Sequence, residues 1–193
     1  MTLLKALTHP RVWHLCLTYF ALIISYYGVV FWLPQILKSF SGLSNAQVSV
    51  MTALPYLAAT VAIVAVGHHS DATGERRWHV AVSAAAGALG LAAAGIFQQA
   101  HPVLALLGLC LAAGGIWGTL GPFWSLPTVF LTGTAAAGGI ALINSMGNAG
   151  GFVGPVLVGK ICDATGSYQA GLMALAATLL AGSALALSVN PDK

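Results

Sequence analysis

Six long stretches of mostly apolar residues follow one another along the chain, and they restrict its fold more than any other feature. A helix of about 20 apolar residues is long enough to cross the hydrocarbon core of a bilayer. The backbone must satisfy its own hydrogen bonds there, and the sequence lacks the period-two alternation of a membrane barrel. We therefore predict an all-α membrane protein, a single bundle of six transmembrane helices over residues 1–193, with spans at roughly 13–37, 46–66, 80–98, 102–124, 136–158 and 169–188.

The scarcity of charge supports this class. Only 6% of the residues are Asp, Glu, Lys or Arg, whereas soluble domains carry about 25%. So few charges cannot cover a water-facing surface. The net charge of +3 arises from scattered side chains rather than from a basic stripe, which argues against nucleic-acid binding.

Nothing in the sequence indicates covalent chemistry. Motifs for a nucleotide, a haem, a nucleophile or a zinc protease are absent, so we expect neither an enzyme nor a cofactor. The cysteines Cys16, Cys110 and Cys162 are isolated, as is typical of small core residues. The adjacent His68 and His69 would point in different directions on a helix, which argues against a metal site there.

The most polar segment, residues 67–79, predicts a short hinge at the membrane surface between the second and third spans. Its pattern returns 92 residues later: Gly67, Asp71 and Gly74 recur as Gly159, Asp163 and Gly166. A shift of three spans reverses the orientation of a helix. The recurrence therefore predicts two inverted three-helix units, about 13–98 and 102–188, as in many secondary transporters. The alternative is a coincidence between two glycine-rich helix ends.

The residues of this hinge suggest a conformational latch. Gly67 and Gly74 would permit close approach and a left-handed turn. Asp71 is expected near the start of the following helix, facing the positive end of its dipole. There it could pair with Arg76 or Arg77 and hold two helices in one conformation. The alternative is a solvated loop whose basic residues only set the topology.

The distribution of basic residues predicts the topology. In a six-span arrangement one side carries Lys5, Arg11, Arg76, Arg77 and Lys193, and the other carries Lys38 and Lys160. Loops rich in Lys and Arg stay in the cytoplasm. We therefore expect an inner-membrane protein with both termini cytoplasmic.

The first span carries tyrosines below its aromatic end. Tyr19 and Tyr26 are seven residues apart and so share a helix face. Their phenols could hydrogen-bond a polar solute in a cavity, or they could anchor the helix at the interface. Trp32 is expected to be such an anchor, and the span is expected to end at Pro34.

The fourth span is expected to break near its end. Pro122 and Pro127 are five residues apart, and a proline inside a helix kinks or interrupts it. Trp124 lies between them, where irregular backbone needs protein or water around it. Trp124 could line a cavity, or it could belong to the interfacial aromatic belt.

The fifth span is the most informative. Asn144 and Asn148 lie on one face near its middle, and an amide in lipid needs a partner. They either bond another helix or line a wet pathway. Pairs of glycines four residues apart, Gly147 with Gly151 and Gly150 with Gly154, allow tight helix crossing. Pro155 follows Gly154, and this Gly-Pro step is expected to bend the helix. None of the spans has a charged residue at its centre, where a proton-coupled carrier usually has one.

These stretches together resemble the major facilitator superfamily and, more narrowly, the C-terminal half of its anion:cation symporter family. Residues 67–77 are similar to the superfamily's loop motif. The narrower likeness lies in residues 26–34, 74–79, 121–127 and 139–155.

The resemblance implies a twelve-span carrier that holds an organic anion, such as a sugar acid, between two six-helix halves and moves it with a proton by rocker-switch alternating access. This chain would supply the second half. The coupling carboxylate and the anion-pairing arginine belong to the other half, as a partner subunit or as part of a longer chain. The positions that match the family's cavity are Tyr19, Tyr26, Trp124, Thr128, Asn144 and Asn148. A homodimeric facilitator and a non-transporting assembly subunit are the alternatives.

Overall fold

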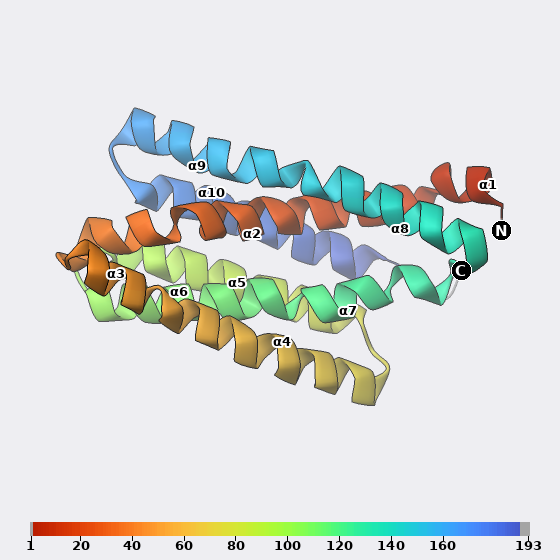
Figure 1. Cartoon of the computed structure of the whole chain (residues 1–193), viewed down its shortest axis with the longest axis horizontal. Coiled ribbons are helices and arrows are strands. Elements are labelled where there is room, and N and C mark those ends of the chain that lie inside the picture. Colours follow the sequence, from red (N-terminus) through yellow and green to blue (C-terminus); the bar gives the residue numbers. More distant parts are fainter. Residues whose placement is uncertain (1, 190–193) are drawn as a thin grey trace.

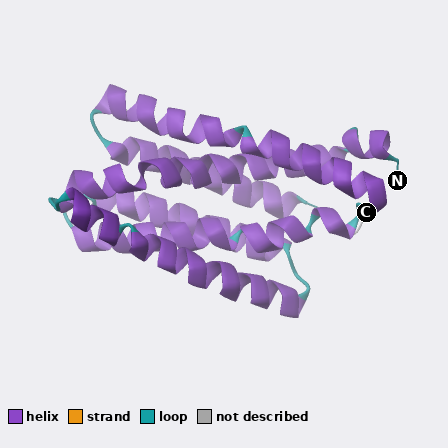
Figure 2. Ribbon diagram, in the orientation of Figure 1, coloured by secondary structure: helices purple, strands orange, loops and turns teal. Residues whose placement is uncertain are grey.

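The computed structural model describes residues 2–189, which form a bundle of long helices joined by short connections (Figures 1 and 2). In chain order the elements are α1 (Leu3–Leu7), α2 (Pro10–Ser41), α3 (Asn45–Met51), α4 (Ala53–Thr73), α5 (Arg77–Phe97), α6 (Pro102–Gly118), α7 (Leu120–Ser125), the 3₁₀ turn η1 (Pro127–Val129), α8 (Gly133–Asn148), α9 (Gly150–Thr165) and α10 (Tyr168–Ser188).

Six helical units within residues 2–189 are long and apolar enough to cross a membrane, which confirms the prediction of six spans. They are Pro10–Ser41, Asn45–Thr73, Arg77–Phe97, Pro102–Val129, Gly133–Thr165 and Tyr168–Ser188. The chain is therefore an integral membrane protein.

Several helices are longer than the apolar stretches that predicted them. Hydropathy marks only the part suited to lipid, whereas helical hydrogen bonding continues until a residue leaves helical geometry. Gly42, Gly74 and Gly166 follow α2, α4 and α9 with φ of 66°, 69° and 68°, a left-handed conformation that glycine adopts without strain. The expectation that the first span ends at Pro34 is wrong. The helix continues because Leu33, on one side of the proline, and further residues beyond it are buried in the bundle.

Two spans are interrupted. The fourth is divided at Thr119 between α6 and α7, and Pro127 opens the 3₁₀ turn that follows, as the two prolines predicted. The fifth is divided at Ala149 between α8 and α9. Pro155 was expected to bend this span, but it lies inside α9, six residues after the break.

The packing agrees with two inverted triplets. The first helix of each triplet packs against the middle helix of the other: α2 against α8 and α9, and α6 against α4. The third helices, α5 and α10, pack against each other. The C-terminal ends of α4 and α9 lie at opposite ends of the bundle (Figure 1), so Asp71 and Asp163 are on opposite sides, as predicted.

The basic residues divide as expected. The start of α2, the α4–α5 connection and the end of α10 share one end of the bundle, which carries Lys5, Arg11, Arg76 and Arg77 (Figure 1). Lys38 and Lys160 lie at the other end. Lys193, assigned to the first group from sequence, lies outside the described residues.

The buried residues form a continuous core between α2, α5, α6 and α10, and the middle helices are left open. In the first and third spans 61% and 56% of the apolar window is buried, but in the second and fifth only 11% and 22%. The second and fifth spans are therefore the least buried of the bundle, and each contributes residues to the candidate site.

Candidate functional site

Aromatic side chains from the first and fourth spans pack against each other. The Tyr19 ring on α2 stacks on Phe123 of α7, with centroids 4.9 Å apart, and meets Trp124 edge-on at 4.8 Å. Tyr19 is buried, whereas Trp124 is half-buried. Trp124 is therefore the most accessible member of this group, and the buried Tyr19 ring packs against it.

A second group continues this surface along α2. Tyr26 lies 4.5 Å from Trp117 of α6, and Trp117 is met edge-on by Tyr56 of α4 at 5.7 Å. All three side chains are half-buried. We call the six residues Tyr19, Tyr26, Tyr56, Trp117, Phe123 and Trp124 the aromatic wall. Such a surface offers phenol and indole groups as hydrogen-bonding partners beside apolar rings.

The predicted asparagines flank this wall on α8. Both are exposed, and Asn148 Nδ2 donates to Asn144 Oδ1 at 2.7 Å and to the Asn144 carbonyl at 2.9 Å. Gly147, next to Asn148, packs against the Tyr19 ring, where an added Cβ would collide. Within residues 2–189 no other group hydrogen-bonds the Asn144 NH₂ or Asn148 Oδ1. Both groups are therefore available to a ligand.

Glycines let α8 and α9 approach α2 closely. A Cβ at Gly151 would lie 2.8 Å from Tyr27 Cδ2, and one at Gly154 would collide with the Ile24 carbonyl oxygen. The predicted tight crossing is therefore present. Trp32 is not a free interfacial anchor, because its Nε1 donates to the Pro155 carbonyl at 2.9 Å and fixes α2 to α9.

Thr128 lies at the end of the fourth span. It belongs to the 3₁₀ turn η1, is exposed, and its hydroxyl donates to the Ser125 carbonyl at 2.9 Å. The structure places it beyond the aromatic wall, toward the end of the bundle that carries Arg76.

The hinge predicted over residues 67–79 is much shorter. Helix α4 continues through Thr73, and only residues 74–76 connect it to α5. Asp71 therefore lies in the last turn of α4 and not at the start of α5, which corrects the prediction. Gly74 makes the left-handed turn that was expected. Gly67 allows no close approach, because an added Cβ there would meet open space.

The ion pair of this hinge joins Asp71 to Arg76. Arg76 Nη1 lies 2.5 Å from Asp71 Oδ1 and donates to Ser70 Oγ at 3.0 Å, and Ser70 donates in turn to the Glu75 carbonyl at 2.7 Å. Arg77 does not join the pair; it donates to the Leu187 carbonyl near the end of α10. The two arginines thus fix the connection to two different helices.

Glu75 takes the place at the α5 N-terminus that was expected for Asp71. Its carboxylate accepts from the Trp78 N–H at 2.9 Å and from the His79 N–H at 3.3 Å, the backbone donors that a helix start leaves free. Partial burial of the carboxyl raises its pKa, but the hydrogen bonds from Trp78 and His79 outweigh it and lower the pKa of Glu75 below its ordinary value. His79 also lies 2.7 Å from His69 across the connection.

The end of α9 has the same local structure as the end of α4. The Thr73 hydroxyl accepts from the Glu75 N–H at 3.4 Å, and the Thr165 hydroxyl accepts from the Ser167 N–H at 3.3 Å. Ser167 then caps α10 by accepting from Gln169 N–H at 3.1 Å. The 92-residue recurrence is therefore structural and not a coincidence.

Sequence reasoning missed Trp117, Tyr56 and Phe123 in the wall. The recurrence itself carried a signal for Tyr56, which lies 92 residues before Asn148. Trp117 and Phe123 had no comparable signal, because their role depends on which face of the fourth span meets α2.

Comparison with known proteins agrees with this architecture. The chain matches the Major Facilitator Superfamily over residues 15–193. It is 44% identical over 189 residues to a putative tartrate transporter of Agrobacterium vitis, covering 98% of this chain and 43% of the relative. It is 37% identical to a quinolone resistance transporter of Acinetobacter baumannii, covering 93% and 41%. It is 35% identical to the inner membrane transport protein RhmT of Escherichia coli (strain K12), covering 97% and 43%.

The chain thus spans less than half the length of these curated relatives. The match begins early in α2 and takes in every span after it, and the inverted triplets are the arrangement found in each half of such carriers. The chain belongs to the major facilitator superfamily.

Proposed function

We propose that this chain acts as the C-terminal half of a cell-membrane carrier that moves an organic anion together with a cation, namely a proton. The observation that carries the proposal is the exposed pair Asn144 and Asn148 beside the aromatic wall, on the otherwise apolar open side of the bundle. Exposed amides at the depth of the hydrocarbon core are unfavourable unless they face a partner or a wet pathway.

The free groups of the pair suit a hydroxylated carboxylate. The Asn144 NH₂ can donate to a carboxylate oxygen, and Asn148 Oδ1 can accept from a hydroxyl. Trp124 and Tyr26 supply apolar surface next to these groups. Tyr19 supports Trp124 in its position, and Thr128 lies beyond the wall with an exposed hydroxyl. The wall and the asparagine pair contain no charged side chain, so the group that neutralises the anion and the carboxylate that carries the proton are assigned to the other half.

The interrupted spans and the charged α4–α5 connection suit a carrier that works by alternating access. Spans 1, 4 and 5 line the open side, and the breaks at Thr119 and Ala149 let two of them flex. The Asp71–Arg76 pair holds the end of α4 to the α4–α5 connection, and Arg77 holds α5 to α10. In the proposed orientation this end is cytoplasmic, so these contacts stabilise one of the two conformations.

The names of several relatives support an anionic substrate. Two proteins of Agrobacterium vitis are named putative tartrate transporters, and a protein of Cupriavidus necator is named a probable sulfoacetate transporter. The substrate class proposed here is therefore a small hydroxylated or acidic carboxylate.

The test is uptake of labelled tartrate into proteoliposomes under an imposed proton gradient. The chain is reconstituted alone and, in parallel, together with the N-terminal half of the Agrobacterium vitis relative. We expect uptake only when both halves are present, and loss of that uptake when the gradient is dissipated.

Gradient-driven uptake by this chain alone would overturn the half-carrier proposal. Uptake by the chain alone that does not depend on the proton gradient would instead support a homodimeric facilitator. No uptake in either preparation, with both halves shown to be folded, would contradict transport of this substrate class.

A further inference from the structure

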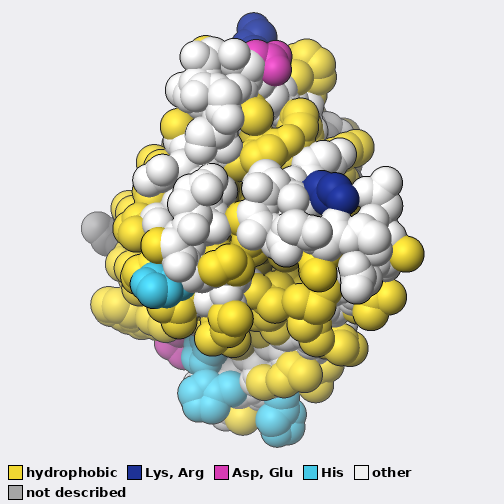
Figure 3. Space-filling model, turned by 90° about the vertical axis from the view of Figure 1, so that its left-hand side faces the viewer, with side chains coloured by type: hydrophobic (Ala, Val, Ile, Leu, Met, Phe, Trp, Pro, Cys, Tyr) yellow, Lys and Arg dark blue, Asp and Glu magenta, His cyan; other side chains and the backbone are white. Residues whose placement is uncertain are grey.

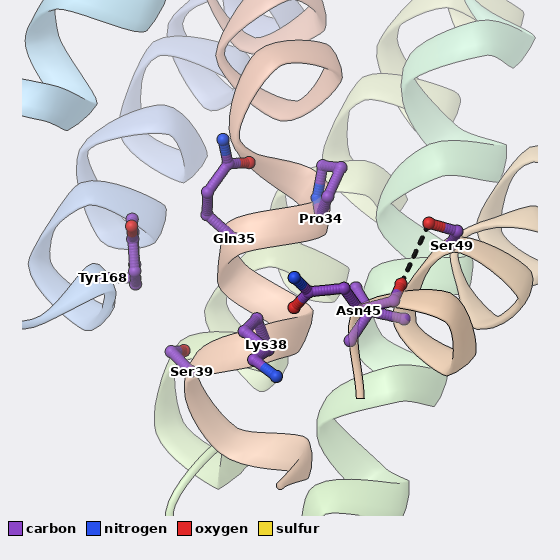
Figure 4. A pocket seen from close by; sticks show the side chains of 8 residues that line it. Pro34, Gln35, Lys38, Ser39, Asn45, Ser49 and Tyr168 are labelled. Carbon is purple, nitrogen blue, oxygen red and sulfur yellow. Dashed lines mark hydrogen bonds between the residues drawn. The ribbon is translucent and has the colours of Figure 1, made fainter. Parts of the chain in front are cut away.

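A pocket of about 450 Å³ lies at the end of the bundle opposite the α4–α5 connection, between α2, α3 and the start of α10 (Figure 4). Its polar lining consists of Gln35, Lys38, Ser39, Asn45, Ser49 and Tyr168. The apolar parts of the lining side chains and Pro34 and Val48 make up the rest of its wall. The proposed function does not use this pocket.

Lys38 is the one charged residue in the pocket lining. Its Nζ donates to the Leu43 carbonyl at 2.5 Å, which holds the ammonium group near the turn that follows α2. An ammonium group has three donors, so two remain for a ligand. The Asn45 side chain lies beside Lys38, whereas the Gln35 amide points away from it, farther along the pocket (Figure 4). The pocket therefore offers a positive charge with a neutral amide next to it.

A stripe of α2 residues runs from the aromatic wall toward the pocket. Tyr27, Phe31, Gln35 and Lys38 follow one another at spacings of three or four residues, and therefore lie on one stripe of the helix. The Tyr27 ring is 5.1 Å from Tyr26 of the wall and 6.2 Å from Phe31. With a rise of 1.5 Å per residue, Lys38 lies about 18 Å along the helix from Tyr26.

We propose that this pocket is an outer capture site, in which Lys38 binds the carboxylate of an incoming organic anion before it reaches the aromatic wall. The ligand class rests on the proposed function. In the proposed topology the pocket opens on the side opposite the cytoplasm, from which an uptake carrier receives its substrate. A cation at the entrance raises the local concentration of anions and the rate of encounter.

Lys160 provides a matched control. It lies at the same end of the bundle, on α9, is exposed and carries the same charge, but it does not line the pocket. Asp163 follows it by three residues, so that an opposite charge is close by. Figure 3 views this end and shows basic side chains well apart, with an acidic side chain beside one of them.

The first test is equilibrium binding of L-tartrate to the full chain in phosphatidylcholine nanodiscs at low salt, measured by ligand-observed NMR. Threitol, the uncharged analogue of tartrate, serves as the control ligand. We expect Lys38→Gln to weaken tartrate binding about fivefold, and Lys160→Gln to weaken it less than twofold. Lys38→Arg should retain binding, and added salt should remove the difference between the variants.

Equal effects of Lys38→Gln and Lys160→Gln, or equal binding of threitol and tartrate, would overturn the capture site. Lys38 could also hold a lipid phosphate, so the titration is repeated with phosphatidylglycerol in the nanodisc. Loss of tartrate binding to the unaltered chain at a small fraction of this lipid would assign the site to lipid and overturn the proposal.

The second test separates this proposal from the proposed function. In the two-half proteoliposomes, Lys38→Gln should raise KM for tartrate about fivefold and leave the maximal rate unchanged. Uptake with the same KM in both lysine variants would overturn the capture site but leave the carrier function standing. Binding that depends on Lys38 without any uptake would contradict the carrier function but leave the site standing.

Discussion

The α4–α6 and α9–α2 crossings occupy equivalent places in the two inverted triplets, yet their glycines lie on opposite partners. In α9 the crossing residues are glycines, and the positions 92 residues earlier in α4 are alanines: Gly150, Gly151 and Gly154 correspond to Ala58, Ala59 and Ala62. In the α4–α6 pair the small residue lies on α6, where a Cβ at Gly114 would be 3.4 Å from Ala62 Cβ.

The two crossings differ in how closely the helices approach, because the glycines lie on different helices. At the α9–α2 crossing a Cβ at Gly150 would lie 2.8 Å from the Phe20 carbonyl oxygen, so backbone meets backbone. At the α4–α6 crossing the nearest group is a methyl. Because the glycines of α9 have no side chain at the crossing, α2 can carry a large residue there, and the Tyr27 ring lies against Gly151. The same scaffold therefore gives one tight, aromatic-lined crossing and one ordinary crossing.

The ends of the two middle helices differ in charge rather than in shape. Both turn at a left-handed glycine after a threonine that caps the turn. After Gly74 come Glu75 and Arg76, and Arg76 pairs with Asp71. After Gly166 come Ser167 and Tyr168, and Asp163 forms no ion pair within residues 2–189. The two ends therefore share a turn, but within residues 2–189 only the end of α4 has an ion pair between carboxylate and arginine.

The largest effect is expected from filling the tight crossing. Gly154→Ala places a methyl against the Ile24 carbonyl, and overpacking of this kind costs about 2 kcal/mol. Gly67→Ala on α4, where a Cβ meets open space, should instead stabilise the helix by about 0.5 kcal/mol. Thermal unfolding in detergent, followed by circular dichroism, measures both. Equal stability of the two variants would show that the crossing is not as close as described.

The next effect concerns the asparagine pair and its counterpart in α4. Asn144→Ala removes the amide proposed to contact the substrate, and the loss of such a hydrogen bond, about 1.4 kcal/mol, raises KM about tenfold. Thr52, 92 residues earlier, donates to the Val48 carbonyl, so Thr52→Ala should change KM less than twofold. The measurement is tartrate uptake by the two-half carrier. KM should therefore rise in Asn144→Ala and stay nearly constant in Thr52→Ala. An unchanged KM in both variants would show that Asn144 does not contact the substrate.

A smaller effect is expected at the two aspartates. Asp71→Asn weakens the pair with Arg76, in which the Asp71 side chain is 72% exposed, so the stability should fall by less than about 1 kcal/mol. If the pair stabilises one conformation of the carrier, the uptake rate should change about threefold, in line with a bias of that size. Asp163→Asn is the control and should change neither quantity. Equal behaviour of the two variants would contradict the role of the pair.

The smallest effect is the pH dependence of the charged connection. Because the folded-state pKa of Glu75 lies below its ordinary value, the ionised carboxylate stabilises the folded chain above the unfolded-state pKa, and this stabilisation is lost as the pH falls through the folded-state pKa. The carboxyl is 36% exposed, so solvent limits the contribution to about 0.5 kcal/mol.

Glu75→Gln should therefore flatten the fall of the melting temperature between about pH 6 and pH 3. Ser167→Ala, at the equivalent end, should lower the melting temperature by a similar amount at every pH, because a hydroxyl does not titrate there. A steeper acid dependence in Glu75→Gln would contradict the lowered pKa.

Local features of the sequence were sufficient for the six spans, their inverted order and the left-handed turn at Gly74. Each of these depends on hydropathy along a single helix or on the conformational freedom of one residue. The glycine spacing likewise predicted close packing of the fifth span, because only small residues permit it.

The contacts between helices were decided by the tertiary structure. Asp71 lies in the last turn of α4 and Glu75 caps α5 because helical hydrogen bonding continues past the end of the apolar stretch, which hydropathy does not register. Tyr56 and Trp117 join the aromatic wall because α4 lies beside α6 and α6 beside α2. Trp32 binds the Pro155 carbonyl because α9 lies beside α2. A pattern along one helix determines which face is apolar or polar, but the partner of that face depends on how distant helices pack.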